Sequence, residues 1–367
     1  MKILKNTFLF FSAISFLVLG SCGNGDDSNP FPGGGNPGTG SGAWSIPINQ
    51  VFDGGPGKDG IPALSNPQFV TAGDATYLTD SDLVIGYKRG DDIRAYPHDI
   101  LDWHEIINDE VDAHPMAITY CPLTGTAIGW ERTLNGTVTT FGVSGLLYQS
   151  NLIPYDRLTD SNWSQMRLDC VNGSLLGTKV ETFQVFETSW ATWQQMYPNT
   201  KVVSTNTGIS RSYGVYPYGD YKVNNERLIF AVSPDDRRIP RKERVLGVVV
   251  GGLAKTYRFS SFNGGTRVVE EAFNGELIVV VGNKDKNFLT AFNRKLEDGT
   301  ELSFVAPSEG ASARVIMEDT EGNQWNAFGE AIGGPREGTV LAGTKSYIGF
   351  WFAWGAFYPN AQIFEFE

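Results

Sequence analysis

Histidine and cysteine side chains gather in one short stretch of the sequence. All three histidines lie between His98 and His114, with His104 between them, and Met116 and Cys121 follow closely. Imidazole, thiolate and thioether together form a soft ligand set that suits copper, and zinc accepts histidine and cysteine equally well. The cluster therefore predicts a copper or zinc site at His104 and Cys121, with His98, His114 and Met116 as further candidate ligands.

The same two residues permit a second interpretation, which is nucleophilic catalysis. A cysteine thiolate activated by a histidine base can attack an acyl carbon, so Cys121 and His104 also predict an acyl-transfer or hydrolytic enzyme. No CxxC or HExxH spacing favours the metal over the nucleophile. A third alternative is that Cys121 is a buried small side chain and His104 a helix-capping or core residue of a non-catalytic binding module.

Several uncommon motifs accompany this pair in a fixed order. They are Trp-His-Glu at 103–105, Tyr-Cys-Pro-Leu-Thr-Gly-Thr at 120–126, Phe-Gly-Val-Ser-Gly-Leu-Leu-Tyr at 141–148, Tyr-Asp-Arg at 155–157 and Trp-Ser-Gln at 163–165. In this order they resemble the exported bacterial proteins of unknown function grouped as DUF3179, over about 59–221 and more weakly beyond. The resemblance implies the extent of the domain and the pairing of His104 with Cys121, but no established activity. Many members carry a second cysteine where this sequence has Thr124, which leaves Cys121 as the single thiol of the motif.

Polar and aromatic side chains of the same block are candidates for a pocket beside Cys121. Arg157 would bind a carboxylate or stabilise an oxyanion, although its neighbour Asp156 equally predicts a turn with a local ion pair. The pocket candidates are Tyr148, Asp156, Arg157, Trp163, Ser164 and Gln165. They predict a small-molecule ligand if no metal is bound.

Two stretches of the chain recur at one common offset. The run at 83–96, typical of a β-hairpin turning at its second glycine, returns at 244–257, and the Trp-x-x-Trp run at 190–199 returns at 351–360. This predicts an internal duplication in which glycines, Gly265 and Gly282, replace His104 and Cys121. Aromatic abundance would also permit a carbohydrate-binding surface. The i, i+3 spacing of the tryptophans instead favours two cores, filled by Trp190, Trp193, Trp351 and Trp354.

Most segments between these matches have the alternation of strands. We expect strands at 116–121, 127–133, 137–143, 228–232, 277–281 and 288–294, and short helices at 97–107 and 187–196. The fold class is therefore α+β, mainly β, with two related lobes. The N-terminal lobe, 44–205, carries the His/Cys site, and the lobe at 206–367 is a degenerate copy.

The N-terminus predicts export and a lipid anchor. Two lysines precede an apolar run at 7–19, and Leu-Gly-Ser-Cys at 19–22 looks like a bacterial lipobox. Residues 1–21 would be the signal peptide, and 22–43 a lipidated Cys22 with a flexible Gly/Pro/Ser linker. We expect an outer-membrane lipoprotein that faces the periplasm or the cell surface and contacts the membrane through its lipid. Cys121 and Cys170 then remain, either as a disulfide or as free thiols.

Composition and charge set the class of the protein. The 367 residues include 29 Lys and Arg against 41 Asp and Glu, a formal charge of −12, and 41% are hydrophobic and 13% aromatic. Such a chain can bury a core and is a soluble globular protein. Phosphate binding needs clustered cations, so nucleic acid is not an expected partner.

Overall fold

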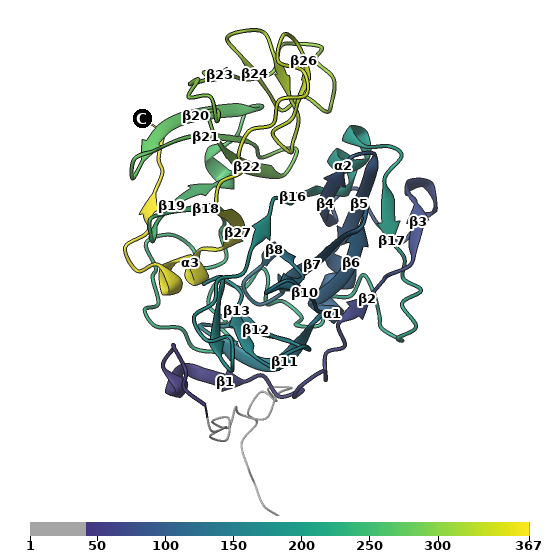
Figure 1. Cartoon of the computed structure of the whole chain (residues 1–367), viewed down its shortest axis with the longest axis vertical. Coiled ribbons are helices and arrows are strands. Elements are labelled where there is room, and N and C mark those ends of the chain that lie inside the picture. Colours follow the sequence, from purple (N-terminus) through teal and green to yellow (C-terminus); the bar gives the residue numbers. More distant parts are fainter. Residues whose placement is uncertain (1–41, 367) are drawn as a thin grey trace, which may run out of the picture. The chain divides into compact units, whose positions relative to one another are not determined.

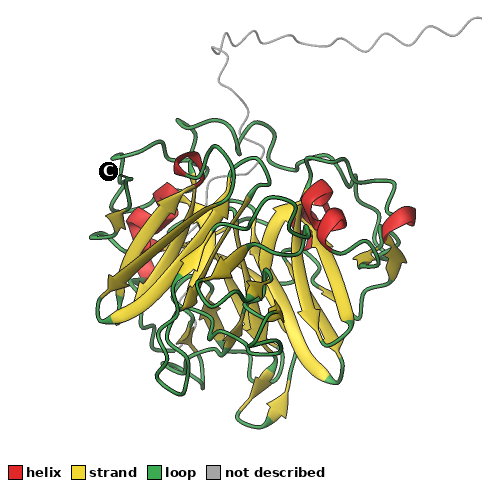
Figure 2. Cartoon of the chain, turned by 90° about the horizontal axis from the view of Figure 1, so that it is seen from above, coloured by secondary structure: helices red, strands yellow, loops and turns green. Residues whose placement is uncertain are grey.

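Strands dominate the computed structural model, which describes residues 42–366 (Figure 1). The described residues include three α-helices of seven residues each: α1 (His98–His104), α2 (Trp190–Met196) and α3 (Trp351–Phe357). Each helix starts where a strand ends, and Figure 2 shows how little of the ribbon is helical. The predicted α+β, mainly β class is confirmed. The predicted signal peptide, Cys22 and nearly all of the linker lie outside the described residues.

Three five-stranded sheets make up the N-terminal half. The first contains, in order of pairing, β16 (Phe186–Ser189), β4 (Leu83–Arg89), β5 (Asp92–Pro97), β17 (Lys201–Val203) and β3 (Phe69–Thr71). The second contains β15 (Thr182–Phe183), β8 (Thr126–Glu131), β7 (His114–Cys121), β6 (Ile106–Val111) and β2 (Leu64–Ser65). The third contains β1 (Val51–Asp53), β11 (Phe141–Tyr148), β12 (Asn151–Asp156), β13 (Asn162–Ser164) and β14 (Asp169–Asn172). A small hairpin joins β9 (Thr133–Leu134) and β10 (Thr137–Val138).

Smaller sheets make up the C-terminal half. One contains β27 (Ser346–Phe350), β18 (Arg244–Val250), β19 (Leu253–Arg258) and β28 (Gln362–Ile363). The next contains β20 (Arg267–Phe273), β21 (Glu276–Asn283) and β22 (Phe288–Asn293). The last contains β23 (Phe304–Val305), β24 (Met317–Asp319), β25 (Gln324–Trp325) and β26 (Ala331–Gly333). Short 3₁₀ turns occur at η1 (Ile48–Gln50), η2 (Ala72–Asp74) and η3 (Phe259–Ser261).

The two predicted hairpins and tryptophan helices are present and packed alike. The β4–β5 hairpin turns at Gly90, whose φ of 55° suits glycine, and β18–β19 turns at a Gly-Gly pair. The ring of Trp193 on α2 lies against Gly86 of β4, where an added Cβ would be only 2.2 Å from the ring. Trp354 on α3 lies against Gly247 of β18, where an added Cβ would also be 2.2 Å from the ring. In both halves, therefore, a glycine makes room for a buried indole.

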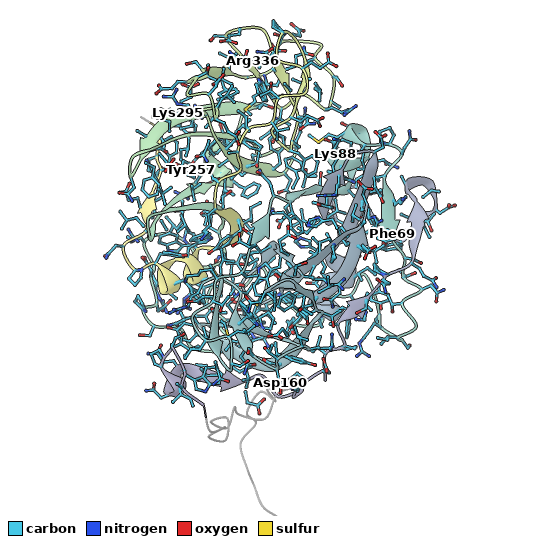
Figure 3. The ribbon with its side chains drawn as sticks, in the orientation of Figure 1. Phe69, Lys88, Asp160, Tyr257, Lys295 and Arg336 are labelled. Carbon is cyan, nitrogen blue, oxygen red and sulfur yellow. The ribbon has the colours of Figure 1, made fainter. Side chains whose placement is uncertain are left out.

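The hydrophobic core is shared between the two halves. One cluster joins Trp130 and Trp163 of the N-terminal half to Trp351 and Trp354 of the C-terminal half, and a second joins Trp193 to β21, β22 and β25. All four repeated tryptophans are at most 4% exposed. They fill cores as predicted. At the junction, Lys88 of β4 (Figure 3) places its ammonium 2.7 Å from the Glu330 carboxylate of the other half.

The connection between the halves differs from expectation. Residues 204–243 contain no helix or strand, so the predicted strand at 228–232 is wrong. Its apolar side chains, Leu228, Ile229, Phe230 and Val232, pack partly buried against the core. Their hydrophobicity is explained by this packing, because the segment pairs with no neighbouring strand. The connection instead passes over the end of β7, where Cys121 lies.

Candidate functional site

Cys121 is the last residue of β7, directly before a tight turn into β8. It pairs with Thr126, and residues 122–125 form the turn, closed by Gly125 at a φ of 60°. The side chain is 1% exposed, and its Sγ lies 3.6 Å from the carbonyl oxygen of Ser150, to which the thiol donates. Cys121 and Cys170 are both free thiols, so no disulfide removes the reactive group.

Segments from elsewhere in the chain hold this turn on both sides. The hydroxyl of Tyr216, in the connection, donates to the carbonyl oxygen of Pro122 at 3.1 Å. The amide of Phe350, at the end of β27, donates to the carbonyl oxygen of Thr124 at 2.7 Å. Cys121 therefore lies where the N-terminal half, the connection and the C-terminal half meet.

A buried network of polar side chains hydrogen-bonds to the turn and to β7. The amide of Asn151 donates to the Thr124 hydroxyl at 3.0 Å and to the side-chain oxygen of Gln165 at 2.7 Å. Gln165 in turn donates to the Thr119 hydroxyl at 3.0 Å. Because every member is buried, the network fixes the backbone on either side of Cys121. Gln165 is thus the one predicted pocket residue that this network ties to the cysteine.

Burial keeps the Cys121 thiol protonated at rest. Desolvation, followed by the negative potential of Glu105, raises its pKa to about 11, although hydrogen bonding from Thr124 opposes the shift. A buried neutral thiol is inert unless a neighbouring group accepts its proton. The neighbours of Cys121 therefore decide what it can do.

One of these neighbours is Glu105, the residue directly after α1. It follows α1 with a φ of 58°, a conformation that a non-glycine residue adopts at a cost, and its carbonyl oxygen accepts the amide of Tyr120 at 2.6 Å. This backbone conformation carries the carboxyl group inward, where it is 7% exposed. Burial, and then the negative charge of Asp102, raise the pKa of Glu105 to about 8. The carboxyl is therefore protonated at neutral pH.

Lys242 reaches the same region from the end of the connection. Its side chain is 7% exposed, and among the described residues its Nζ has no hydrogen-bond partner. The Nζ lies 3.0 Å from the centroid of the Tyr221 ring and 4.7 Å from that of Phe352. Desolvation, followed by repulsion from Arg241 and Arg227, lowers the pKa of Lys242 to about 6, and the Cys121 thiolate opposes this shift. At neutral pH Lys242 is therefore mainly a free amine.

Tyrosine side chains of the connection complete the surroundings of Cys121. Burial is the main cause that raises the pKa of Tyr216, Tyr218 and Tyr221, and Cys121 contributes to each shift. All three phenols are neutral at neutral pH. The described residues around the thiol thus combine a neutral amine, a neutral carboxyl group and neutral phenols.

His104 has other partners. Its Nδ1 lies 2.7 Å from the carbonyl oxygen of Pro62, and its Nε2 lies 2.6 Å from the hydroxyl of Tyr213. A carbonyl can only accept, so Nδ1 carries the proton and Nε2 accepts from Tyr213. Burial lowers the pKa of His104, which keeps the ring neutral. Neither nitrogen hydrogen-bonds to Cys121.

The remaining predicted metal ligands also have separate surroundings. His98 packs on the Tyr120 ring, 4.5 Å between centroids, and its Nε2 is 3.6 Å from the Glu187 carboxylate. His114 bonds through Nδ1 to Tyr87 and through Nε2 to Glu131. Met116 belongs to the apolar cluster with Tyr96 and Ile118.

Residues 42–366 contain no group of three or more His, Cys, Asp or Glu side chains that could hold a metal ion. The donor set therefore does not fit a shared metal as it is arranged here. Copper or zinc at His104 and Cys121 stays a prediction from the sequence, and these contacts give it no support.

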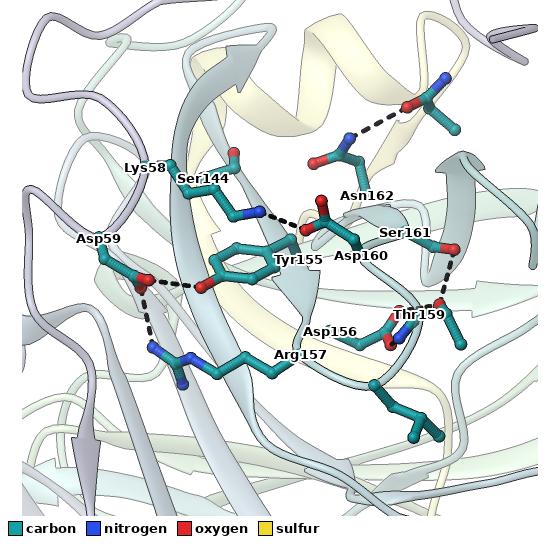
Figure 4. Close-up of polar contacts among 12 residues, drawn as sticks. Lys58, Asp59, Ser144, Tyr155, Asp156, Arg157, Thr159, Asp160, Ser161 and Asn162 are labelled. Atoms are coloured by element: carbon teal, nitrogen blue, oxygen red, sulfur yellow. Dashed lines mark hydrogen bonds and ion pairs between the residues drawn. The ribbon is translucent and has the colours of Figure 1, made fainter.

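Two of the predicted pocket residues, Asp156 and Arg157, form structural contacts at the end of β12 (Figure 4). Asp156 does not pair with Arg157. It accepts from the indole of Trp163 at 2.9 Å, while Arg157 pairs with Asp59 at 2.8 Å. The expected local ion pair is therefore absent, because each side chain finds a partner from another segment.

The other two pocket candidates also lie apart from a common ligand site. Ser164 is 1% exposed, and its hydroxyl has no hydrogen-bond partner among the described residues. Tyr148 packs edge-on against Phe357 of α3, 5.5 Å between centroids. A cavity of about 420 Å³ between the halves is lined by Gln184 and Thr290, among others, but by neither of these residues nor by Cys121.

The sequence did not indicate Glu105 or Lys242, the two ionisable residues whose pKa values are coupled to that of Cys121. Glu105 belongs to the Trp-His-Glu motif, but in that motif His104 is the residue whose type suggests a ligand or a base. The Tyr-Pro-Tyr run at 216–218 was a usable signal, since a cluster of aromatic residues in a glycine-rich connection suggests packing over a site. Lys242 had no local signal, because only the path of the connection brings it to Cys121.

Comparison with known proteins identifies one family. A family model described as "Protein of unknown function (DUF3179)" matches residues 58–361, which is most of the chain and includes both halves. No curated protein and no solved structure matches the chain. In the described part of the chain, no helix is long and apolar enough to cross a membrane.

Proposed function

The chain belongs to the DUF3179 family, and from that premise we propose that it is a thiol-dependent acyl-transfer or hydrolytic enzyme with Cys121 as nucleophile. The observation that carries the proposal is the buried amine of Lys242, which has no hydrogen-bond partner in the described structure and whose pKa is affected by the charge of Cys121. Groups with strongly perturbed pKa values gather at catalytic sites. In this proposal Lys242, rather than His104, is the general base.

The chemistry uses one proton and one acyl group. The neutral amine of Lys242 takes the thiol proton of Cys121, and the thiolate attacks the carbonyl carbon of the substrate. The bond from that carbon to the leaving group breaks, and the leaving group takes the proton from the Lys242 ammonium. Water then attacks the thioester, giving one proton through Lys242 to the departing thiolate. Lysine serves as the base in this way in known serine–lysine enzymes.

In this proposal, ionisation of Glu105 sets the upper pH limit of the reaction. While protonated it adds no negative charge beside the thiolate, whereas its ionised form would repel the thiolate. The Thr124 hydroxyl, which hydrogen-bonds the sulfur, stabilises the thiolate as it forms. The proposal therefore assigns a working range between the pKa values of Lys242 and Glu105.

We expect a bell-shaped dependence of activity on pH. Activity should rise through about 6 as Lys242 loses its proton and fall through about 8 as Glu105 ionises. The measurement is hydrolysis of p-nitrophenyl acetate by the full chain across this range. Cys121→Ser should lower the rate by about 100-fold or more, since the alcohol is a far weaker nucleophile.

Cys170→Ser is the matched control, because Cys170 is a buried free thiol of similarly raised pKa, about 11, without a lysine partner. Its rate should equal that of the wild type. A rate that climbs steadily beyond pH 8, or that survives Cys121→Ser, would count against the proposal.

We also propose that the C-terminal half is a degenerate copy of the N-terminal half that supplies one wall of the site. The equivalent Gly–Trp pairs and hairpins support this origin. The copy contributes Phe350 and Phe352, which lie beside the Lys242 amine, but no cysteine. Its role would be to keep water away from the amine and so maintain its low pKa.

Export and anchoring are proposed on the sequence of residues 1–43. The lipobox-like segment predicts that Cys22 is lipidated and holds the protein at the outer membrane. When the full chain is produced in a bacterium that processes lipoproteins, we expect it in the detergent phase of a Triton X-114 partition. Cys22→Ala should move it to the aqueous phase, and Cys170→Ser should not. A detergent-phase Cys22→Ala protein would contradict the anchor.

A further inference from the structure

Resting on the proposed function, we infer that residues 207–222 form a strap that closes over Cys121, and that His104 is the positioning residue that holds the strap shut. The strap is the part of the connection that lies against α1 and the Cys121 turn. It contains no helix or strand, so side-chain contacts must hold it in place. Its role would be to control access to the thiol.

Three contacts fasten the strap to the N-terminal half besides His104. The Tyr216 hydroxyl binds the carbonyl oxygen of Pro122 in the Cys121 turn. The indole of Trp103, on α1, donates to the carbonyl oxygen of Val215 at 3.2 Å. The Lys222 ammonium lies 2.8 Å from the Asp102 carboxylate. This ion pair joins Lys222 of the strap to Asp102 of α1.

His104 supplies the contact nearest the start of the strap. Because Pro62 fixes the proton on Nδ1, the Nε2 lone pair points at the Tyr213 hydroxyl and accepts from it. The Thr207 hydroxyl lies 2.6 Å from the same tyrosine oxygen and donates to it. One imidazole thus joins residue 62, the end of α1 and both ends of the loop at 207–213.

Three glycines give the strap positions at which its backbone can turn. Gly208, Gly214 and Gly219 all have positive φ values, between 64° and 84°, where glycine rotates without strain. Val215, between two anchors, is 61% exposed, so one face of the strap is in water. Beneath it Cys121 is 1% exposed. In this inference, a substrate reaches the thiol when the strap opens.

The test measures how fast iodoacetamide alkylates each cysteine of the full chain, followed by peptide mass analysis. We expect His104→Ala and Tyr213→Phe to raise the rate at Cys121 about tenfold, while Cys170 in the same molecules keeps its rate. Tyr213→Phe removes only a hydroxyl and preserves the ring, so the fold should survive it. His114→Ala, a histidine on the same strand as Cys121, is the control and should leave both rates unchanged.

Any other pattern of alkylation overturns the strap. Slower alkylation of Cys121 in His104→Ala would show that His104 activates the thiol. An unchanged rate at Cys121 would show that His104 does not keep the strap closed. Equal acceleration at Cys170 would indicate general loosening of the fold. Faster alkylation of Cys121 without any ester hydrolysis by the wild type would retain the strap and reject the enzyme, so the two proposals fail separately.

Discussion

Replacing Lys242 by methionine is expected to stop acyl transfer at Cys121 and, at the same time, to stabilise the protein. The amine is buried among aromatic rings without a hydrogen-bond partner in the described structure, so the fold bears the cost of its desolvation. Methionine has a similar length and no charge to desolvate. A catalytic group that costs stability is common where function requires a strained site.

The sign of the stability effect follows from the pKa of Lys242. The amine has a pKa of 10.5 in its ordinary state and about 6 in the folded protein, so between these values the unfolded chain binds more protons. The contribution of Lys242 to the stability of the wild type is therefore most favourable above pH 10.5 and is lost as the pH falls toward 6. Lys242→Met removes this loss, and its advantage should grow as the pH falls through that range.

The expected size is about 2 kcal/mol at pH 7, within the range of about 1–3 kcal/mol for a polar group buried without a hydrogen bond. Urea unfolding at pH 7 and pH 10 measures the effect. The rate of p-nitrophenyl acetate hydrolysis should fall by about 100-fold or more, as expected for loss of a general base.

Lys179→Met is the matched control, because the Lys179 side chain is 64% exposed and its buried partner Asp169 keeps Arg167 as a second cation. It should change neither stability nor rate. If Lys242→Met destabilises the protein and leaves the rate intact, Lys242 is a structural cation held by aromatic rings, and the proposed base is wrong.

Alanine in place of Gly86 is expected to be strongly destabilising. The added Cβ would lie 2.2 Å from the ring of Trp193, which is fully buried and cannot move without disturbing its core. Overpacking of this kind costs about 1–3 kcal/mol, and the short distance places Gly86→Ala at about 3 kcal/mol. Gly247→Ala should cost a similar amount, because the same calculated distance separates its Cβ from Trp354.

Urea unfolding of both variants measures the cost. Gly73→Ala is the control, since its added Cβ would approach only the Thr71 hydroxyl, at 3.9 Å, and its φ is not positive. We expect Gly73→Ala to stay within about 0.5 kcal/mol of the wild type. If Gly86→Ala proved as stable as Gly73→Ala, the indole would not be held against β4 in the way described.

Much of the fold was predictable because its signals are local. Alternating apolar residues located β7, β8, β21 and β22, and the paired tryptophans located α2 and α3. The strand predicted at 228–232 is wrong for a physical reason, because an apolar run that packs on a core without pairing has the same composition as a strand. Local pattern does not distinguish these two uses of hydrophobic residues.

The site was only partly predictable. A functional role for Cys121 stays a prediction from the sequence, and the partner predicted for it, His104, hydrogen-bonds instead to Pro62 and Tyr213. The residue of the Trp-His-Glu motif that contributes to the raised pKa of the Cys121 thiol is Glu105, not His104. Lys242 lies far along the chain, and its approach depends on the whole path of residues 204–243, which no motif encodes.

The most direct test of the central claim is to trap the acyl-enzyme. The full chain is mixed with p-nitrophenyl acetate at pH 7, quenched in acid and digested, and the acetylated residues are located by mass. We predict one acetyl group, on Cys121, that is absent from Lys242→Met and unaffected by Lys179→Met. Acetylation of Cys170 to the same extent, acetylation of Lys242 itself, or an unmodified Cys121 would contradict the assignment of Cys121 as the nucleophile and Lys242 as its base.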